Sequence, residues 1–151
     1  MAWRRERPRP LLPCRCCRPF ALSCLLQDLA ALMGPLAAQK GLRFTLDNQL
    51  PPGLQATGDA MRVRQILLNL LSNAVKFTSR GTITLHARSD GELRALHFEV
   101  CDTGPGISQE QQQRLFRRFE QADGARTAAQ YGGSGLGLAI CRELAHAMQG
   151  R

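Results

Sequence analysis

The sequence predicts an α+β fold in which a mixed β-sheet packs on helices as a two-layer sandwich. Two observations favour this class. Apolar residues recur at helical spacing in some segments and alternate at strand spacing in others, and helices separate most of the strands along the chain. The composition, with 44% hydrophobic and 21% charged residues, is that of a globular protein, and 151 residues suit one domain.

Residues 1–19 are expected to form a disordered tail. They hold six Arg residues against Glu6 alone, so they carry +5 of the net charge of +8, and they hold four of the eight Pro residues. Such a segment has too little apolar surface to form a core. The folded domain is therefore expected to cover residues 20–151, and the basic balance of the chain belongs largely to the tail.

The first two helices and the strand between them carry clear periodic patterns. Residues 22–38 repeat Leu or Met every three or four positions, which predicts an amphipathic helix that Gly41 ends. Residues 42–46 alternate as a strand, and residues 48–53 contain the Pro and Gly of a loop. Asp59 can cap the second helix. The apolar stripe of this helix comprises Val63, Ile66, Leu67, Leu70, Leu71 and Ala74.

The remaining elements are shorter. Residues 83–87 and 96–100 alternate as two strands, and residues 90–91 between them have the Asp-Gly pair of a hairpin turn. A short helix is expected near residues 108–116, and a last helix follows from about residue 135. The apolar stripe expected for the last helix comprises Ile140, Leu144 and Met148.

The six Cys residues indicate neither a disulfide framework nor a zinc site. Four of them crowd into the first 24 residues, where no His residue accompanies them as a metal ligand. Cys101 and Cys141 lie in apolar strand and helix patterns and are expected to be small core residues. From this cysteine pattern we expect free thiols and a cytoplasmic location. The sequence also has no uncharged apolar stretch long enough for a membrane span, so we expect no membrane contact by this segment.

The second helix carries the first candidate site. Asn69 and Asn73 are four residues apart, and Lys76 and Phe77 follow at helical spacing, so all four lie on or near one face. Two carboxamides beside an ammonium group are poor core material. An amide oxygen is a hard ligand that suits Mg²⁺, and a lysine offers a point charge to phosphate. The simpler interpretation is a solvated helix face.

Two glycine-containing segments supply the other candidate sites. Asp102 ends an apolar strand, where its carboxylate can accept a hydrogen bond from the exocyclic amine of adenine, and residues 102–107 continue with Gly104 and Gly106. Residues 132–138 contain closely spaced glycines that lead into a helix, a pattern that exposes backbone N–H groups to an anion. Taken alone, residues 102–107 are better explained as a plain turn, and glycine-rich loops such as residues 132–138 are too common to be specific. Residues 132–138 lack both the spacing of a P-loop and the preceding strand of a Rossmann site.

In this order the three sites resemble the ATP-binding domain of sensor histidine kinases, in the superfamily of gyrase, Hsp90, histidine kinase and MutL ATPases. Residues 69–77 resemble the N-box, residues 102–107 and 132–138 the two glycine boxes, and residues 115–121 the F-box. The resemblance covers about residues 20–151 and is nearest to hybrid two-component sensor kinases. It implies the Bergerat ATP-binding fold.

The resemblance also implies roles for single residues. Asn73 would hold Mg²⁺ on the phosphates of ATP, Asn69 would support this metal or phosphate site, and Lys76 would contact phosphate. Asp102 would hold the adenine amine, and residues 120–134 would form a mobile lid over the nucleotide. Arg117 or Arg118 would reach the γ-phosphate. The other implied nucleotide contacts are Phe77, Gly104, Gly106, Ile107, Gly133, Ser134, Gly135, Leu136 and Gly137.

Position 69 bears on the reaction. The resemblance implies that hydrolytic and serine-kinase members place a Glu four residues before the metal-binding Asn, where it activates a nucleophile. Asn69 occupies that position here, and an amide has no useful basicity at neutral pH. The sequence therefore favours presentation of Mg-ATP to a histidine, a nucleophile that needs no base, over hydrolysis of ATP. Catalysis would then consist mostly of positioning and charge neutralisation.

Two departures from the family pattern limit what this chain does alone. None of His86, His97 and His146 is followed by an acidic residue, so a phospho-accepting histidine is expected on a separate dimerisation domain, with a response regulator receiver domain as a further partner. The family also continues into more strands than this sequence holds, so the C-terminal strands of the sheet are expected to be missing. Kinase activity is therefore expected only with the dimerisation domain.

Other functions are compatible with the sequence. The intact motifs without an acceptor histidine also fit a degenerate, inactive nucleotide-binding fragment with a regulatory role. Nucleic-acid binding through the Arg-rich tail is disfavoured, because the tail is rich in Pro and has no basic helix pattern. A chaperone or repair ATPase is disfavoured by Asn69 and by the lack of further domains.

Overall fold

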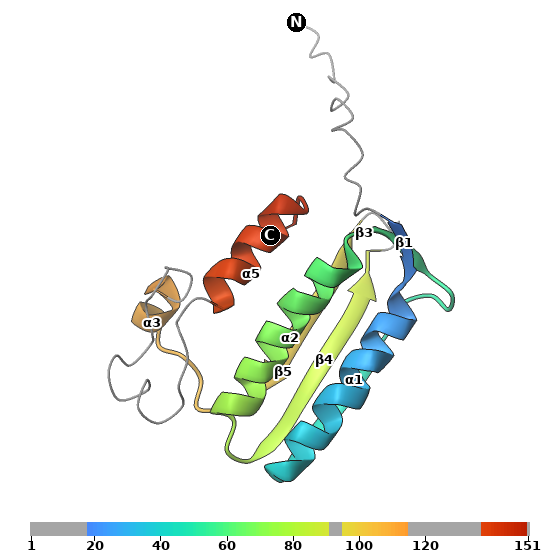
Figure 1. Cartoon of the computed structure of the whole chain (residues 1–151). Helices are drawn as coiled ribbons and strands as arrows, with labels where there is room; N and C mark the ends of the chain where they lie inside the picture. Colours follow the sequence, from blue (N-terminus) through green and yellow to red (C-terminus); the bar gives the residue numbers. More distant parts are fainter. Residues whose placement is uncertain (1–17, 91–94, 115–136, 151) are drawn as a thin grey trace, which may run out of the picture.

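The computed structural model describes residues 18–90, 95–114 and 137–150. Figure 1 shows the elements coloured in chain order, with α1, α2 and α5 lying over one face of a sheet. The elements are β1 (Arg18–Ala21), α1 (Leu22–Gln39), β2 (Leu42–Asn48), β3 (Gln55–Gly58), α2 (Ala60–Phe77), β4 (Gly81–Ser89), β5 (Leu96–Asp102), α3 (Gln109–Arg114) and α5 (Gly137–Ala147).

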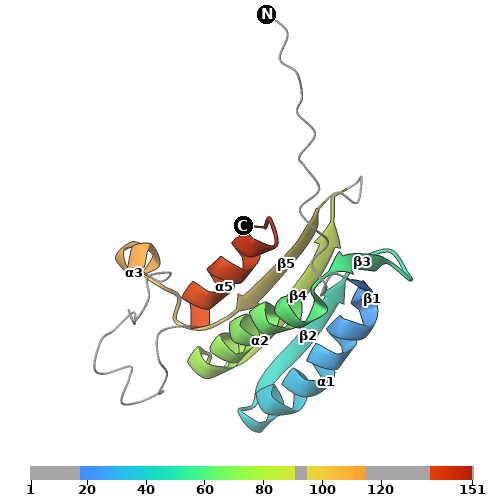
Figure 2. The ribbon, with the colours of Figure 1, turned by 45° about the horizontal axis from the view of Figure 1, so that its top comes forward.

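The main sheet is mixed and has the order β2-β4-β5 among the described strands. Strand β4 runs parallel to β2, with Phe44 opposite Ile83, and antiparallel to β5, with Leu85 opposite Val100. Figure 2 shows α1 and α2 side by side over this sheet, with α5 next to α2. The α+β sandwich expected from the sequence and the antiparallel pairing expected of the hairpin are therefore present. Of the expected turn, Gly91 lies outside the described residues.

The core lies between the sheet and the helices. Strand β4 contributes Ile83, Leu85 and Ala87, all three fully buried, because side chains two residues apart share one face of a strand. Helix α2 contributes Leu67 and Leu71, which are 1% and 0% exposed. Helix α1 adds Leu22, Leu25, Leu26, Leu29, Met33 and Ala37. These side chains form one continuous cluster that fixes α2 against the centre of the sheet.

Helix α2 begins and ends as its sequence predicts. The Asp59 side chain accepts a hydrogen bond from the backbone N–H of Arg62, at 3.2 Å, which satisfies a donor of the first turn. At the other end, Thr78 donates its backbone N–H to the carbonyl of Ala74 at 3.0 Å. The Thr78 side chain is completely buried. Because a buried hydroxyl needs a partner, Thr78 links the end of this helix to a neighbouring element.

A second, two-stranded sheet differs from the sequence expectation. Strand β1 pairs antiparallel with β3, with Arg18 opposite Gly58 and Ala21 opposite Gln55. For Arg18 and Pro19 the expected disorder is therefore wrong, and β3 was not expected at all. Both strands have four residues and too few alternating apolar positions to be recognised. Residues 1–17 lie outside the described part of the chain.

Three further expectations about burial need correction. Cys101 is exposed, since it faces the side of β5 opposite to the half-buried Val100. Helix α5 buries Ala139 and Cys141, whereas Ile140 is 39% exposed, so the buried stripe is offset from the one expected. In α1, Leu32 is 45% exposed although it continues the leucine repeat. Within the described ranges, no helix has the length and apolarity needed to span a membrane.

The core predicts a large difference between two leucine substitutions. Leu71→Ala is expected to lower the free energy of unfolding by about 2–5 kcal/mol, because the side chain is fully buried between α2 and the sheet. Leu32→Ala is the matched control and is expected to cost less than about 1 kcal/mol, since Leu32 is 45% exposed. Urea unfolding followed by circular dichroism measures both. Equal losses in the two variants would contradict this position of the core.

Candidate functional site

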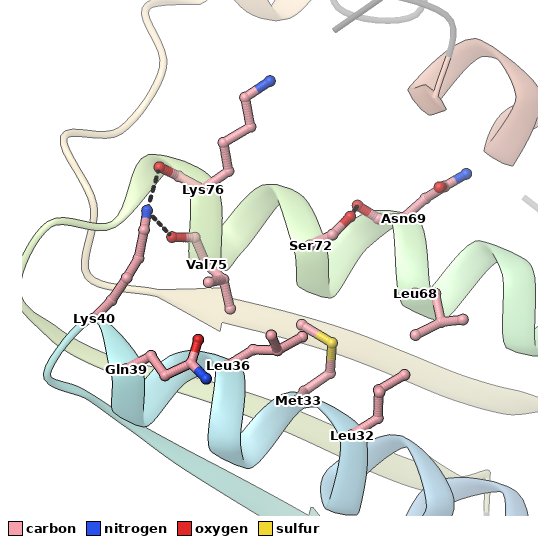
Figure 3. Close-up of a pocket in the computed structure, with 10 residues that line it drawn as sticks. All are labelled: Leu32, Met33, Leu36, Gln39, Lys40, Leu68, Asn69, Ser72, Val75 and Lys76. Atoms are coloured by element: carbon pink, nitrogen blue, oxygen red, sulfur yellow. Dashed lines mark hydrogen bonds between the residues drawn. The ribbon is translucent and has the colours of Figure 1, made fainter. Parts of the chain in front are cut away.

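Helix α2 presents a polar face beside its buried one. Asn69, Asn73 and Lys76 are half-buried on this helix, whereas Phe77, at its end, is 39% exposed. Figure 3 shows the side chains of Asn69 and Lys76 projecting from the side of α2 that faces away from α1. The structure therefore brings these expected site residues together on one helix, with the buried leucines behind them.

Asn69 connects this face to helix α5. Its side-chain Nδ2 donates a hydrogen bond to Sγ of the buried Cys141, at 3.4 Å. The Cys141 thiol in turn donates to the backbone carbonyl of Ile66, at 3.8 Å. Burial raises the pKa of the Cys141 thiol, and the hydrogen bond from Asn69 lowers it in part. Gly137, the first residue of α5, is also close, because a Cβ added to it would lie 4.0 Å from Asn69 Cγ. The expected sites at residues 69 and 137 are therefore neighbours.

Lys76 and Phe77 form a contact of their own. The Lys76 ammonium lies 5.0 Å from the centroid of the Phe77 ring, within the range of a cation–π interaction. The partly exposed ring of Phe77 thus holds a positive charge at the end of α2 in this structure. If the ammonium moved to a phosphate group near this end, it would lose only the cation–π contact, which at exposed sites is worth about 0.5–1 kcal/mol.

Asp102 occupies the end of β5, next to the end of α2. Its Oδ1 accepts hydrogen bonds from the backbone N–H of Gly104 at 2.8 Å and from Thr78 Oγ1 at 3.4 Å. A Cβ on Gly104 would lie 2.7 Å from that oxygen and 3.4 Å from the Phe77 carbonyl, so a side chain there would displace the carboxylate. Gly106 has φ of +74°, a conformation that L side chains rarely adopt. Ile107, which follows, is 46% exposed.

Thr78 is a site residue that the sequence analysis did not find. It is buried, and it is the direct link between the last turn of α2 and the carboxylate of Asp102. In the sequence, only its position directly after the polar face of α2 could have indicated this role, and a single hydroxyl residue forms no recognisable pattern. The Thr78–Asp102 contact joins the expected metal and phosphate residues to the expected adenine residue.

The donor set of the site suits Mg²⁺ and phosphate. Mg²⁺ prefers hard oxygen ligands and usually keeps several water molecules, so a neutral amide such as that of Asn73, with phosphate oxygens of a ligand, is a suitable donor set. Among the residues described, no cluster of three or more His, Cys, Asp or Glu residues is arranged to hold a metal ion. Some of the expected contacts lie outside the described residues: Arg117, Arg118, Gly133, Ser134, Gly135 and Leu136.

Comparison with known proteins identifies related chains. The family described as histidine kinase-, DNA gyrase B-, and HSP90-like ATPase matches residues 58–151, more than half of the chain. The chain is 44% identical over 133 residues to the aerobic respiration control sensor protein ArcB of Escherichia coli strain K12, covering 88% of this chain and 17% of ArcB. It is 38% identical over 136 residues to the autoinducer 2 sensor kinase/phosphatase LuxQ of Vibrio harveyi, covering 87% of this chain and 16% of LuxQ. It thus spans about a sixth of the length of these curated relatives.

Solved structures share the same arrangement of strands and helices. Full-length ShkA in complex with AMPPNP aligns with a TM-score of 0.74 at 39% identity, covering 88% of this chain and 26% of that one. The histidine kinase ThkA in complex with the response regulator protein TrrA aligns with a TM-score of 0.70 at 23% identity, covering 89% of this chain and 36% of that one, and this likeness concerns the fold alone. The predicted α+β fold and the predicted resemblance are both confirmed.

Proposed function

The chain belongs to the histidine kinase-, DNA gyrase B-, and HSP90-like ATPase family, and from this premise we propose that it is the ATP-binding catalytic domain of a two-component sensor histidine kinase. One observation carries the proposal. The amide and ammonium face of α2 ends at Thr78, whose hydroxyl is bonded to Asp102, so groups for phosphate and groups for adenine meet at one end of the sheet. The ShkA structure, solved with the ATP analogue AMPPNP, supports nucleotide as the ligand.

Asp102 is the proposed adenine-binding residue. Both contacts that orient its carboxylate, from Gly104 and Thr78, fall on Oδ1. The second oxygen, Oδ2, is then held in a defined direction and can accept a hydrogen bond from the exocyclic amine of the base. A base with a carbonyl at that position, such as guanine, would present an acceptor to an acceptor. The arrangement therefore favours adenine, since an unmatched polar pair costs about 1–3 kcal/mol.

Asn73 and Lys76 are the proposed partners of the metal and the phosphates. Asn73 would contribute its amide oxygen to Mg²⁺, which neutralises charge on the phosphates when bound. Lys76 would move its ammonium from the Phe77 ring to a phosphate oxygen. Gly137 stands at the start of α5, beside Asn69, where backbone N–H groups can approach an anion. By the family resemblance, Arg118, Gly133, Ser134, Gly135 and Leu136 complete the nucleotide contacts.

The proposed reaction transfers the γ-phosphate of ATP to a histidine on a separate dimerisation domain. The relatives ArcB, a sensor protein, and LuxQ, a sensor kinase/phosphatase, support this proposal. Asn69 supports this assignment over hydrolysis, because its amide cannot act as a general base. The proposal places the domain in the cytoplasm, where ATP is available.

Removal of the Asp102 carboxylate is expected to weaken nucleotide binding. Asp102→Ala should raise the Kd for Mg-AMPPNP by about tenfold or more, because the adenine amine loses its acceptor. Glu99→Gln is the matched control. Glu99 is an exposed carboxylate on the same strand, it pairs with Arg88 at a distance of 3.5 Å, and this pair lies away from the site. Calorimetry measures both, and the thermal shift of the unsubstituted chain at millimolar Mg-AMPPNP gives an independent readout. The absence of any shift or heat in the unsubstituted chain would contradict nucleotide binding.

Phosphotransfer is expected only when the acceptor is added. With labelled ATP, the chain alone should remain unlabelled, and a His-bearing dimerisation domain of a related hybrid kinase should become labelled in its presence. Gel autoradiography detects the transfer, and acid treatment distinguishes phosphohistidine, which is acid-labile, from phosphoserine. Asn73→Ala in the same assay should abolish the signal, because Mg²⁺ loses its protein ligand. Nucleotide binding without transfer to any such domain would favour an inactive regulatory fragment instead.

Substitution of Asn69 is expected to change the reaction from transfer toward hydrolysis. Asn69→Glu places a carboxylate where it can activate water, and the ATP hydrolysis rate should rise by about tenfold or more. Asn69→Gln has the same side-chain length as Asn69→Glu but carries an amide, so it serves as the control, with no rise expected. A coupled assay of phosphate release measures both variants. An unchanged rate in Asn69→Glu, with nucleotide affinity retained, would show that the residue at position 69 does not set the outcome.

A further inference from the structure

Lys40 connects the ends of the two long helices. Its side-chain Nζ donates hydrogen bonds to the backbone carbonyls of Val75, at 2.8 Å, and Lys76, at 3.1 Å. Figure 3 shows these two bonds crossing from the end of α1 to the end of α2. The last four carbonyls of an α-helix have no partner within the helix, and the helix dipole makes this end negative, so a cation is favoured there.

The backbone of Lys40 is fixed where this contact needs it. Lys40 follows the last residue of α1 and donates its own N–H to the carbonyl of Ala37 at 3.0 Å. Two residues later β2 begins at Leu42, which lies opposite Gly81 of β4. The chain is therefore held by a helix on one side of Lys40 and by the sheet on the other. The side chain starts from a rigid point, so its two hydrogen bonds can restrain α2.

The helices are less tightly packed near this contact than at the core. A groove of about 630 Å³ lies between α1 and α2. Its apolar walls include Leu36 and Leu68, and Lys40 and Lys76 lie among its lining residues. Leu36, on the α1 wall of this groove, is 43% exposed, so apolar contact between the two helices is incomplete here. The polar bridge from Lys40 supplies a restraint where close packing is incomplete.

The restrained turn is the one that carries the proposed ligand groups. Lys76 and Phe77 lie in the last turn of α2, Asn73 lies directly before that turn, and Thr78 follows with its bond to Asp102. Lys40 holds the carbonyl of the very residue whose ammonium would contact phosphate. A carbonyl and the side chain of the same residue share one Cα, so fixing the peptide fixes the direction in which the side chain leaves the helix.

We propose that Lys40 is a positioning residue for nucleotide phosphates, acting through the last turn of α2 and Lys76 rather than by touching the ligand. This inference rests on the proposed function. It assigns a role to a lysine that lies outside the expected nucleotide-binding motifs, directly after the end of α1.

The test compares Lys40→Met with a matched control. Arg64→Met removes the other polar bridge between α1 and α2, from Arg64 Nη1 to Asp28 Oδ2 at 3.3 Å, together with one positive charge. In the full chain, Lys40→Met should raise the Kd for Mg-AMPPNP by about fivefold, whereas Arg64→Met should leave it within about twofold. Lys40→Arg keeps a charged donor and should restore most of the affinity. Equal effects of Lys40→Met and Arg64→Met would overturn the inference.

Two further measurements separate positioning from general destabilisation. Adenosine lacks phosphates, so its Kd should be the same for Lys40→Met and the unsubstituted chain, and an equal loss of adenosine affinity would overturn the inference. If Lys40 acts through Lys76, the double variant Lys40→Met/Lys76→Met should bind Mg-AMPPNP no more weakly than Lys76→Met alone. Fully additive losses would show that Lys40 acts independently of Lys76 and would overturn it as well.

The same titrations distinguish this inference from the proposed function. If the unsubstituted chain binds Mg-AMPPNP and Lys40→Met binds equally well, the inference fails and the proposed function stands. If the unsubstituted chain does not bind, both fail together.

Discussion

Helix α2 serves the hydrophobic core and the site at the same time, because its 3.6-residue period separates two sets of side chains on one rod. Leu67 and Leu71 face the sheet and are fully buried. Asn69 and Asn73 each follow one of these leucines by two residues, which turns them to the other side of the helix. A displacement of the buried set would move the polar set by the same amount. The positions of the side chains proposed to bind metal and phosphate therefore depend on the packing of leucines against β4.

Three polar contacts tie neighbouring elements to α2 around this packed face. Thr78 bonds to Asp102 of β5, Asn69 bonds to Cys141 of α5, and Lys40 at the end of α1 bonds to the final carbonyls of α2. Each such contact contributes only about 0.5–1.5 kcal/mol net, far less than the core. Their effect is directional, since each one fixes the orientation of a group in or beside the site. Stability comes from the apolar face and geometry from these contacts.

The sequence predicted the parts of the fold that have a long, regular period. The α1 and α2 helices and strands β2, β4 and β5 were found in this way, because burial on one face imposes a repeat on the residues. Strands β1 and β3 were missed, since four-residue segments hold too few repeats. Cys101 was misplaced because its apolar character does not decide its burial: the alternation of residues 96–100 puts position 101 on the opposite face of the strand. The roles of Asp102 and Asn73 came from the order of motifs and the family resemblance, and spacing alone left them ambiguous.

Position 69 shows how packing and chemistry can favour the same residue type. The Asn69 amide donates a hydrogen bond from Nδ2 to Cys141 Sγ, and the Cys141 thiol donates in turn to the carbonyl of Ile66. Cys141 therefore accepts from Asn69 and donates to the backbone of α2. A carboxylate at position 69 has no proton to donate at neutral pH. It could meet the sulfur only by accepting the thiol proton, which would take that proton from Ile66. The group that bonds α5 to α2 at this position is thus an amide, and the same choice leaves position 69 without a carboxylate that could activate water.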